Sequence, residues 1–230
     1  MMEYLVIGTN GIGGVLATQL AEKNHTVFGT YFQHPKTNTN NIEYYPLNVL
    51  DNNIDLSFLP EKLDGLAYCV GSIMLKPFQR LSANDFIQDY QLQVVGAVKL
   101  LQLCLPKLKQ SQQASVVLFS TIAVQTGFNF HSLVSASKGA IEGLTKALAA
   151  EWAPAIRVNC IAPSITNTAL AQNFLSTPEK IELNAQRHPL KKIGSANDVA
   201  NLASFLLSPE SSWITGQTFH IDGGMSSIKL

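Results

Sequence analysis

The stretch YLVIGTNGIG, residues 4–13, places a short apolar run directly before a glycine-rich turn. Residues 12–23, which follow, carry apolar side chains at helical spacing. A strand, a glycine turn and a helix in this order are typical of sites where backbone amides and a helix start hold a pyrophosphate. The same glycines also suit a tight turn that binds nothing, so this stretch alone leaves both interpretations open.

Short apolar runs alternate with longer helical patterns along the rest of the chain, which is typical of a parallel sheet covered on both faces. The expected strands are Tyr4–Gly8, Thr26–Tyr31, Ile42–Leu47, Gly65–Val70, Ser115–Ser120, Ile156–Ile161 and Gln217–Ile221. The expected helices are Ile12–Lys23, Asn84–Lys109, Ser132–Trp152 and Asn197–Leu207. Right-handed crossovers would wind these elements into an α/β fold, a Rossmann-type doubly wound parallel sheet of about seven strands in three α/β/α layers.

The length of 230 residues suits one dinucleotide-binding domain over residues 1–230. Within it, Thr166–Lys192 has a weaker pattern and follows a late strand, where a short substrate lid would lie beyond the carboxyl end of the sheet. The apolar residues Leu170, Phe174 and Leu175 in this segment predict a partly apolar pocket.

Composition excludes several classes of function. Apolar residues make up 46% of the chain and charged residues 14%, which is low for a soluble domain and favours subunit contacts. The net charge is zero, so we expect no nucleic-acid partner and no membrane surface. The N-terminus lacks the positive region of a signal peptide, because Glu3 stands there, and a soluble cytoplasmic protein is expected. Cys69, Cys104 and Cys160 lack metal-ligand spacing and predict reduced thiols and no metal site.

The residues after the second expected strand bear on which dinucleotide is bound. The stretch Gly29–Lys36 contains no carboxylate that would hold the ribose 2′-hydroxyl of NAD. It does contain His34 and Lys36, which would suit a 2′-phosphate, although no arginine is present. The sequence therefore favours NADP over NAD and leaves NAD as the alternative.

Several ordered motifs together resemble the short-chain dehydrogenase/reductase family over essentially the whole chain. These motifs are Ser137–Thr145, Ala149–Pro154, Ile156–Pro163, His188–Gly194, Thr215–Gln217 and Asp222–Gly224. The resemblance implies the Rossmann-type fold and an NAD(P)-dependent transfer of hydride between nicotinamide and a small carbonyl or alcohol substrate. It also implies that matching helices pack between subunits in a homodimer or homotetramer.

The resemblance further implies a path for the cofactor, carried over position by position. The residues on this path are Gly8, Thr9, Asn10, Gly11, Ile12, Gly13, Tyr31, Asn48, Val49, Val70, Gly71, Lys138, Pro163, Ser164, Ile165 and Thr168. The first gap between glycines is one residue shorter than usual in the family. Asn48 replaces an aspartate near the adenine, and Ser164 replaces the usual glycine in the segment that holds the carboxamide.

The positions that carry the family's chemistry are altered. The family uses a tyrosine four residues before a lysine, where the ammonium lowers the pKa of the phenol so that it transfers a proton. Here Lys138 is present, but Val134 occupies the tyrosine position. Thr121 stands at the serine position, which orients the substrate oxygen, and Gln93 stands at the asparagine position.

Other groups are candidates for the missing proton donor. His131 precedes Lys138 by seven residues, two helical turns away on the same face, and an imidazole suits acid–base work near neutral pH. It equally suits an ordinary loop histidine. Tyr68 and Tyr90 are the nearest phenols in family terms, and for Tyr68 a place in the core or the pocket wall is the simpler interpretation.

Two hypotheses of different classes follow. The first is an NAD(P)-dependent oxidoreductase with a nonstandard proton donor. The second is a catalytically silent dinucleotide-binding sensor or assembly protein on the same fold, which the loss of the tyrosine motivates. A third, that no dinucleotide binds, rests on the shortened turn and on Asn48.

Overall fold

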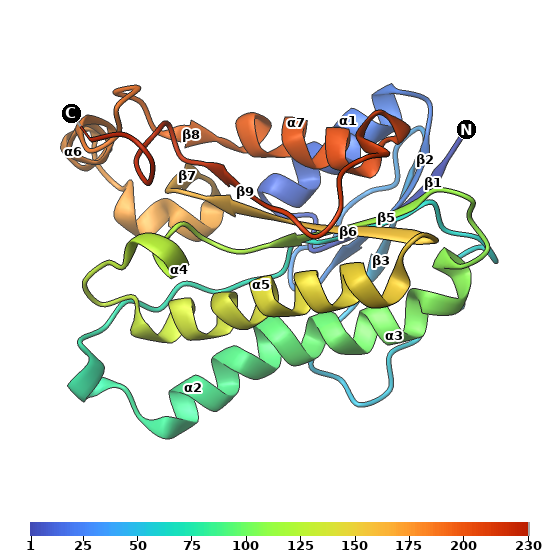
Figure 1. Ribbon diagram of the computed structural model, residues 1–230, viewed down its shortest axis with the longest axis horizontal. Helices are drawn as coiled ribbons and strands as arrows, with labels where there is room; N and C mark the ends of the chain where they lie inside the picture. Colours follow the sequence, from blue (N-terminus) through green and yellow to red (C-terminus); the bar gives the residue numbers. More distant parts are fainter. Residues whose placement is uncertain (230) are drawn as a thin grey trace.

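Seven parallel strands form a twisted sheet through the middle of the molecule in a computed structural model that describes residues 1–229 (Figure 1). Their order is β3-β2-β1-β4-β5-β6-β9, so the chain starts in the centre and winds outward in both directions. The strands are β1 (Glu3–Ile7), β2 (Thr26–Tyr31), β3 (Ile42–Pro46), β4 (Gly65–Tyr68), β5 (Ala114–Phe119), β6 (Ile156–Pro163) and β9 (Thr218–Ile221). This topology confirms the predicted doubly wound sheet.

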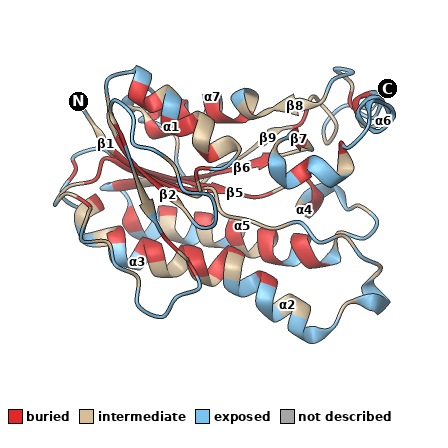
Figure 2. Ribbon diagram, turned by 180° about the vertical axis from the view of Figure 1, so that it is seen from behind, coloured by how far each residue is buried: buried red, intermediate tan, exposed pale blue. Residues whose placement is uncertain are grey.

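Helices cover both faces of the sheet and complete three layers. On one face lie α1 (Ile12–Glu22) and α7 (Ala196–Leu207), which pack against each other. On the other lie α5 (Ser132–Trp152) and a long helical stretch made of α2 (Ala83–Tyr90), the π-helical segment η2 (Gln91–Val95) and α3 (Gly96–Leu108). Figure 2 shows buried residues in the strands and on the helix faces turned toward them.

The core consists of two apolar clusters, one on each face of the sheet. Alternate residues of β1 supply both, since Leu5 and Ile7 belong to one cluster and Tyr4 and Val6 to the other. All four side chains are buried. Full burial of a side chain of this size contributes roughly 1.5–3 kcal/mol, which explains why the strands are continuous apolar runs.

The segment predicted as a lid forms small elements beyond the carboxyl end of β6. They are β7 (Thr166–Asn167), the 3-10 helix η3 (Ala169–Phe174), α6 (Pro178–Gln186) and β8 (Gly194–Ser195), which pairs with β7. Thr177 caps α6 by accepting a hydrogen bond from the Lys180 amide, and Pro178 occupies the first turn. The remaining elements are η1 (Phe78–Arg80), the short helix α4 (Ala123–Thr126) and η4 (Pro209–Ser211).

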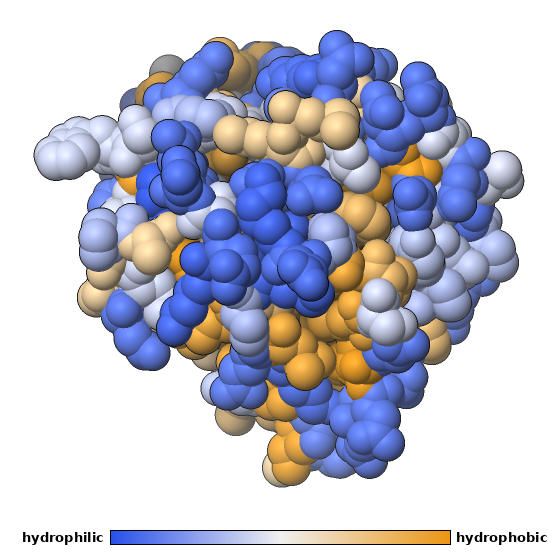
Figure 3. All heavy atoms as spheres, turned by 90° about the vertical axis from the view of Figure 1, so that its right-hand side faces the viewer, coloured by the Kyte–Doolittle hydropathy of each residue, from blue (hydrophilic) through white to orange (hydrophobic). Residues whose placement is uncertain are grey.

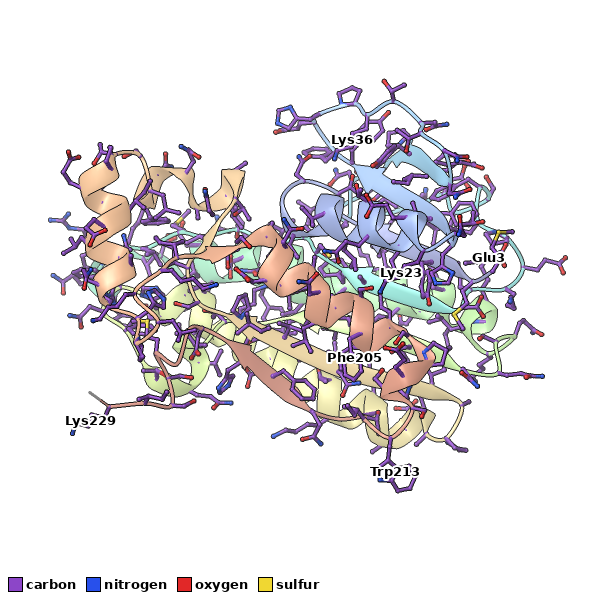
Figure 4. The ribbon with its side chains drawn as sticks, turned by 90° about the horizontal axis from the view of Figure 1, so that it is seen from above. Glu3, Lys23, Lys36, Phe205, Trp213 and Lys229 are labelled. Carbon is purple, nitrogen blue, oxygen red and sulfur yellow. The ribbon has the colours of Figure 1, made fainter. Side chains whose placement is uncertain are left out.

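The surface carries several large apolar side chains. Phe78 and Trp213 are strongly exposed, and Figure 3 shows an apolar area among polar atoms on the end of the molecule away from α4 and α6. Trp213 projects outward from the body (Figure 4). The predicted homo-oligomer would cover such groups, and it stays a prediction.

Among residues 1–229, no helix is long and apolar enough to cross a membrane. The three cysteines form no disulfide; Cys104 and Cys160 are buried, whereas Cys69, also expected in the interior, is only partly buried.

Candidate functional site

The glycine turn joins β1 to α1 at the carboxyl end of the sheet. Gly8 and Gly11 have φ values of +83° and +68°, a region that favours glycine. A Cβ on Gly13 would overlap the carbonyl oxygen of Gly8, so the helix starts in direct contact with the turn. The shortened loop is held by Thr9, whose amide and hydroxyl both donate to the carbonyl of Thr30 at 2.9 Å.

The N-terminus of α1 has no side-chain cap. The first backbone amides of α1 therefore have no side-chain partner. They point out of the N-terminal end of the helix, where the partial positive charge of the helix dipole favours an anion. Ile12, at this helix start, also lines the main cavity, which has a volume of about 440 Å³. The turn thus fits a pyrophosphate on the evidence of its own backbone.

The cavity extends from this helix start to the lid and gathers most of the residues predicted for the nicotinamide end. Its lining includes Ile12, Val70, Gly71, Thr121, His131, Val134, Lys138, Pro163, Ser164, Ile165 and Thr168. From the lid it receives Leu170 and Phe174, whereas Leu175 is buried within the lid and does not line the cavity. The prediction that Leu175 lines the pocket was therefore wrong, because this side chain packs into the interior.

The residues predicted near the adenine lie apart from this cavity. Tyr31, Asn48 and Val49 are absent from its lining. The Asn48 side chain is engaged locally, since its amide donates to Asp51 at 2.7 Å and its oxygen accepts from the Leu50 amide at 3.1 Å. Val49 is buried beside Gly96. Their role at the adenine stays a prediction.

Lys36 lies on the other side of the glycine turn, at a second, open cavity of about 480 Å³ (Figure 4). Its Nζ donates to the carbonyl of Thr9 at 2.6 Å and lies 5.4 Å from the centre of the Tyr44 ring. Partial burial lowers the pKa of this ammonium. A cation is thereby fixed against the turn, whereas His34 is exposed and lines neither cavity.

Lys138 is the one charged side chain buried in the wall of the main cavity. Burial lowers the pKa of its ammonium to about 8, while Cys160 and Asp89 act in the opposite direction. Val134 is buried one helical turn earlier and has no proton to give. No tyrosine among residues 1–229 lines the main cavity.

Asp89, a residue that sequence reasoning missed, organises a buried polar floor just behind the cavity wall, in which only Ser72 lines the cavity itself. Its buried carboxylate accepts hydrogen bonds from Ser72 at 2.7 Å, from Ser137 at 2.6 Å and from Gln93 Nε2, which lies 2.8 Å from each oxygen. Ser72 follows β4, and Ser137 immediately precedes Lys138 on α5. Asp89 therefore connects three elements at the position of the reactive lysine.

This carboxylate also fixes the direction of the Gln93 amide. Because Nε2 donates to Asp89, Oε1 must face the other way. A Cβ on Gly71 would lie 3.4 Å from Gln93 Oε1 and 3.5 Å from Lys138 Nζ, so both atoms converge on Gly71. Gln93 Oε1 is buried and has no hydrogen-bond partner within the described chain. A buried acceptor beside an ammonium fits a ligand that brings hydroxyl groups to this point, as a cofactor ribose does.

The π-helical segment places Gln93 on this floor. Tyr68 donates a hydrogen bond at 2.7 Å to the carbonyl of Leu92, inside η2, and its hydroxyl lies where a Cβ on Gly96 would be. The Tyr68 phenol is buried, and burial raises its pKa. Tyr68 is thus a core residue, as the simpler interpretation had it, and Tyr90 is exposed outside the cavity. π-turns frequently occur at functional sites.

Two histidines line the cavity. His131 occupies the N-cap position of α5 without making a capping hydrogen bond, and its Nδ1 lies 2.8 Å from the carbonyl of Asn129 in the preceding exposed loop. His188, which sequence reasoning did not propose, is 2% exposed. Its Nε2 lies 2.8 Å from Ser164 Oγ and its Nδ1 lies 2.8 Å from the carbonyl of Asn184. Two features of the sequence could have pointed to Ser164 and His188. Ser164 stands where the resemblance implies a glycine, and His188 opens the motif His188–Gly194.

The outer part of the cavity carries cations. Lys180 and Arg187 from the α6 region line it, and the Arg187 guanidinium lies 5.8 Å from the centre of the Phe128 ring. Neither side chain has a carboxylate within 4.0 Å among residues 1–229. Within residues 1–229, no group of three His, Cys, Asp or Glu side chains is placed to hold a metal ion.

Comparison with known proteins places this site in context. A family model described as Enoyl-(Acyl carrier protein) reductase matches residues 6–226. Tropinone reductase homologs of Arabidopsis thaliana are 39% and 37% identical over 72% and 74% of this chain. These matches span 54% and 65% of the relatives' own lengths.

Solved structures share the fold over almost the whole chain. A short-chain type dehydrogenase/reductase from Mycobacterium ulcerans has a TM-score of 0.88 at 26% identity, covering 98% of this chain and 90% of that one. The protein ElxO with NADP bound has a TM-score of 0.87 at 26% identity, covering 99% of this chain and 100% of that one. The family predicted from the sequence motifs is thereby confirmed, and the chain belongs to the short-chain dehydrogenase/reductase family of oxidoreductases.

Proposed function

We propose that this protein transfers a hydride between NADP(H) and a small carbonyl or alcohol substrate. The observation that carries the proposal is the main cavity, which joins the uncapped start of α1 to Lys138 and Thr121, with Gln93 Oε1 buried behind Gly71 in its wall. When bound, the nicotinamide supplies or accepts the hydride. The chain supplies position and electrostatics around it.

Each part of the cavity has a task in this proposal. The turn from Gly8 to Gly13 and the start of α1 bind the pyrophosphate. Lys138 and Gln93 bind ribose hydroxyls, and the stretch Pro163–Thr168 faces the carboxamide. Thr121 orients the substrate oxygen.

The preference for NADP rests on Lys36. Its ammonium is held against the Thr9 carbonyl beside the glycine turn, and the stretch after β2 offers no carboxylate to a ribose 2′-hydroxyl. A phosphate at that ribose position would find a cation already in place. The NADP bound to ElxO supports a nicotinamide dinucleotide in this fold.

The first experiment is a binding titration of the purified protein with NADPH and with NADH, followed by fluorescence. Micromolar binding, tighter for NADPH, is expected, and no binding of either would contradict the proposal. A screen of ketones, aldehydes and alcohols then follows. It should contain matched neutral and carboxylate-bearing substrates, because Lys180 and Arg187 line the outer cavity without carboxylate partners.

A specific observation favours a second candidate, a dinucleotide-binding sensor or assembly protein without turnover. Val134 stands at the tyrosine position, and no tyrosine lines the main cavity within the described chain. Tight NADPH binding without turnover over the whole screen would support this candidate. Measurable turnover of any substrate would remove it.

A further inference from the structure

We propose that Ser164 and His188 form the proton-transfer pair that replaces the missing tyrosine. This proposal rests on the proposed oxidoreductase function and names the group that completes it. Both residues line the main cavity, and their side chains are joined by a contact of 2.8 Å between Ser164 Oγ and His188 Nε2. His188 is buried, so its ring keeps one orientation.

The second nitrogen of His188 fixes where its hydrogens lie. Nδ1 is 2.8 Å from the backbone carbonyl oxygen of Asn184, which has no hydrogen to give. Nδ1 therefore carries the hydrogen and donates it. In the neutral ring, Nε2 is then an acceptor, and the Ser164 hydroxyl donates to it.

Protonation of the ring reverses the second contact. An imidazolium carries hydrogen on both nitrogens, so Nε2 donates to Ser164 Oγ. The hydroxyl hydrogen of Ser164 is then released to donate elsewhere. The other neighbour of Oγ is the weak acceptor Met225 Sδ at 3.5 Å, which does not compete with a substrate oxygen.

The pair lies beside the residue that is proposed to orient the substrate. Ser164 follows β6 and Thr121 follows the neighbouring strand β5. The Ile122 amide donates to the Pro163 carbonyl at 3.3 Å, so the residue after Thr121 is bonded to the residue before Ser164. Two hydroxyl groups thus stand on adjacent strand ends at one cavity.

In the direction of reduction, the proposed step transfers one hydride and one proton to the carbonyl group. The carbonyl carbon receives the hydride of the reduced nicotinamide, and the electron pair of the C=O π bond moves to oxygen. That oxygen takes the proton of the Ser164 hydroxyl while Oγ takes the proton of His188 Nε2. The products are the alcohol, the oxidised cofactor and a neutral His188, which regains a proton from solvent. Alcohol oxidation uses the same steps in reverse.

His131 is the competing donor and provides the matched comparison. It also lines the cavity, and its Nδ1 also faces a carbonyl, that of Asn129. However, it lies in an exposed loop at the start of α5, and no hydroxyl contacts its Nε2. The two histidines therefore differ in burial and in having a serine partner.

The test measures kcat, KM and NADPH affinity for S164A, S164G, H188Q and H131A with the best substrate from the screen. Loss of a general acid typically lowers the rate ~10² to 10⁴-fold, so we expect kcat to fall by about 100-fold or more in S164A, S164G and H188Q. In H188Q, which lies outside the residues assigned to the cofactor, NADPH affinity and KM should stay within about twofold, and H131A should keep most of its rate. S164G removes the same hydroxyl in a second way, and thermal denaturation of each variant checks that it folds.

A double variant shows whether the two residues act in one chain. If His188 acts only through Ser164, S164A/H188Q loses no more activity than either single variant. If the loss of kcat in the double variant equals the product of the two single losses, the residues act independently, and the proposed pair is overturned. An active S164A or S164G would overturn it too, and would leave the oxidoreductase function intact. A wild-type protein that binds no NADPH or turns over no substrate would overturn both proposals.

Discussion

The two ends of the expected cofactor path are built very differently. At the nicotinamide end, residues from α5 and from the ends of β4, β5 and β6 converge on one cavity, and Asp89 of α2 supports them from behind with hydrogen bonds. At the expected adenine end, Asn48 bonds to Asp51 and Leu50 within an exposed turn, and Val49 is buried against Gly96. We therefore expect NADPH affinity to depend more on residues around the main cavity and the glycine turn than on Asn48 and Val49.

The largest effect is expected from Lys138→Met. It removes the buried ammonium that charge-assisted hydrogen bonds to ribose would use, which should weaken NADPH binding by about 10- to 100-fold. Since burial lowers the pKa of Lys138 to about 8, NADPH binding to the wild type should also weaken as pH rises through that value. Titrations with NADPH at several pH values measure this. If Lys138→Met bound NADPH as tightly as the wild type, the expected dependence on the nicotinamide end would be contradicted.

The free protein should show the opposite pH trend in stability. Lys138 has a pKa of about 8 when folded and its ordinary value of 10.5 when unfolded, so the unfolded chain binds more protons between these values. Stability relative to Lys138→Met should therefore rise with pH across this window. Chemical denaturation of both proteins at several pH values measures the difference.

The next effect is expected from Asp89→Asn. An amide cannot accept from Ser72, Ser137 and Gln93 at once, so the Gln93 amide loses its fixed direction. Unfolding free energy should fall by about 2 kcal/mol and NADPH affinity by about 10-fold. Denaturation and binding titrations check both quantities. Glu61→Gln, an exposed change without these contacts, is the matched control and should alter neither.

A smaller and selective effect is expected from Lys36→Gln. It removes the cation beside the glycine turn while keeping a polar side chain of similar length. NADPH affinity should fall by about 10-fold while NADH affinity is unchanged, because only NADPH carries the 2′-phosphate. Equal losses for both cofactors would show that Lys36 supports the turn rather than reading the phosphate.

The smallest effect is expected from Asn48→Ala. Its side chain serves a local turn, so NADPH affinity should change by less than about twofold, with a stability loss of about 1 kcal/mol. A large loss of affinity without loss of stability would show that Asn48 contacts the adenine after all. The difference between the two ends of the path would then disappear.

Patterns within short stretches predicted most of the fold. Each of the seven expected strands is present within a few residues, because strands buried on both faces are continuous apolar runs. The single helix expected over Asn84–Lys109 is interrupted by η2, where Tyr68 of a distant strand bonds to the Leu92 carbonyl. The lid helix α6 was not predicted because its sequence is mostly polar and exposed.

The candidate site was predictable where motifs carried it. Lys138, Thr121, Gly71 and Ser164 line the cavity as the resemblance implied. Asp89 carries no local signal, because its partners Ser72 and Ser137 are 17 and 48 residues away along the chain. Only the packing of α2 against α5 brings them together.

The contact between Thr168 and Gly11 bears on the order in which ligands enter and leave. A Cβ on Gly11 would lie 3.3 Å from Cβ and Cγ2 of Thr168, so the start of the lid touches the glycine turn. If a dinucleotide binds along that turn as proposed, Thr168 would cover it and the substrate would enter from the lid side. We expect a compulsory sequence of addition, with the dinucleotide first on and last off. An inert substrate analogue should then inhibit uncompetitively against NADPH, and a noncompetitive or mixed pattern would show that the crossing imposes no order.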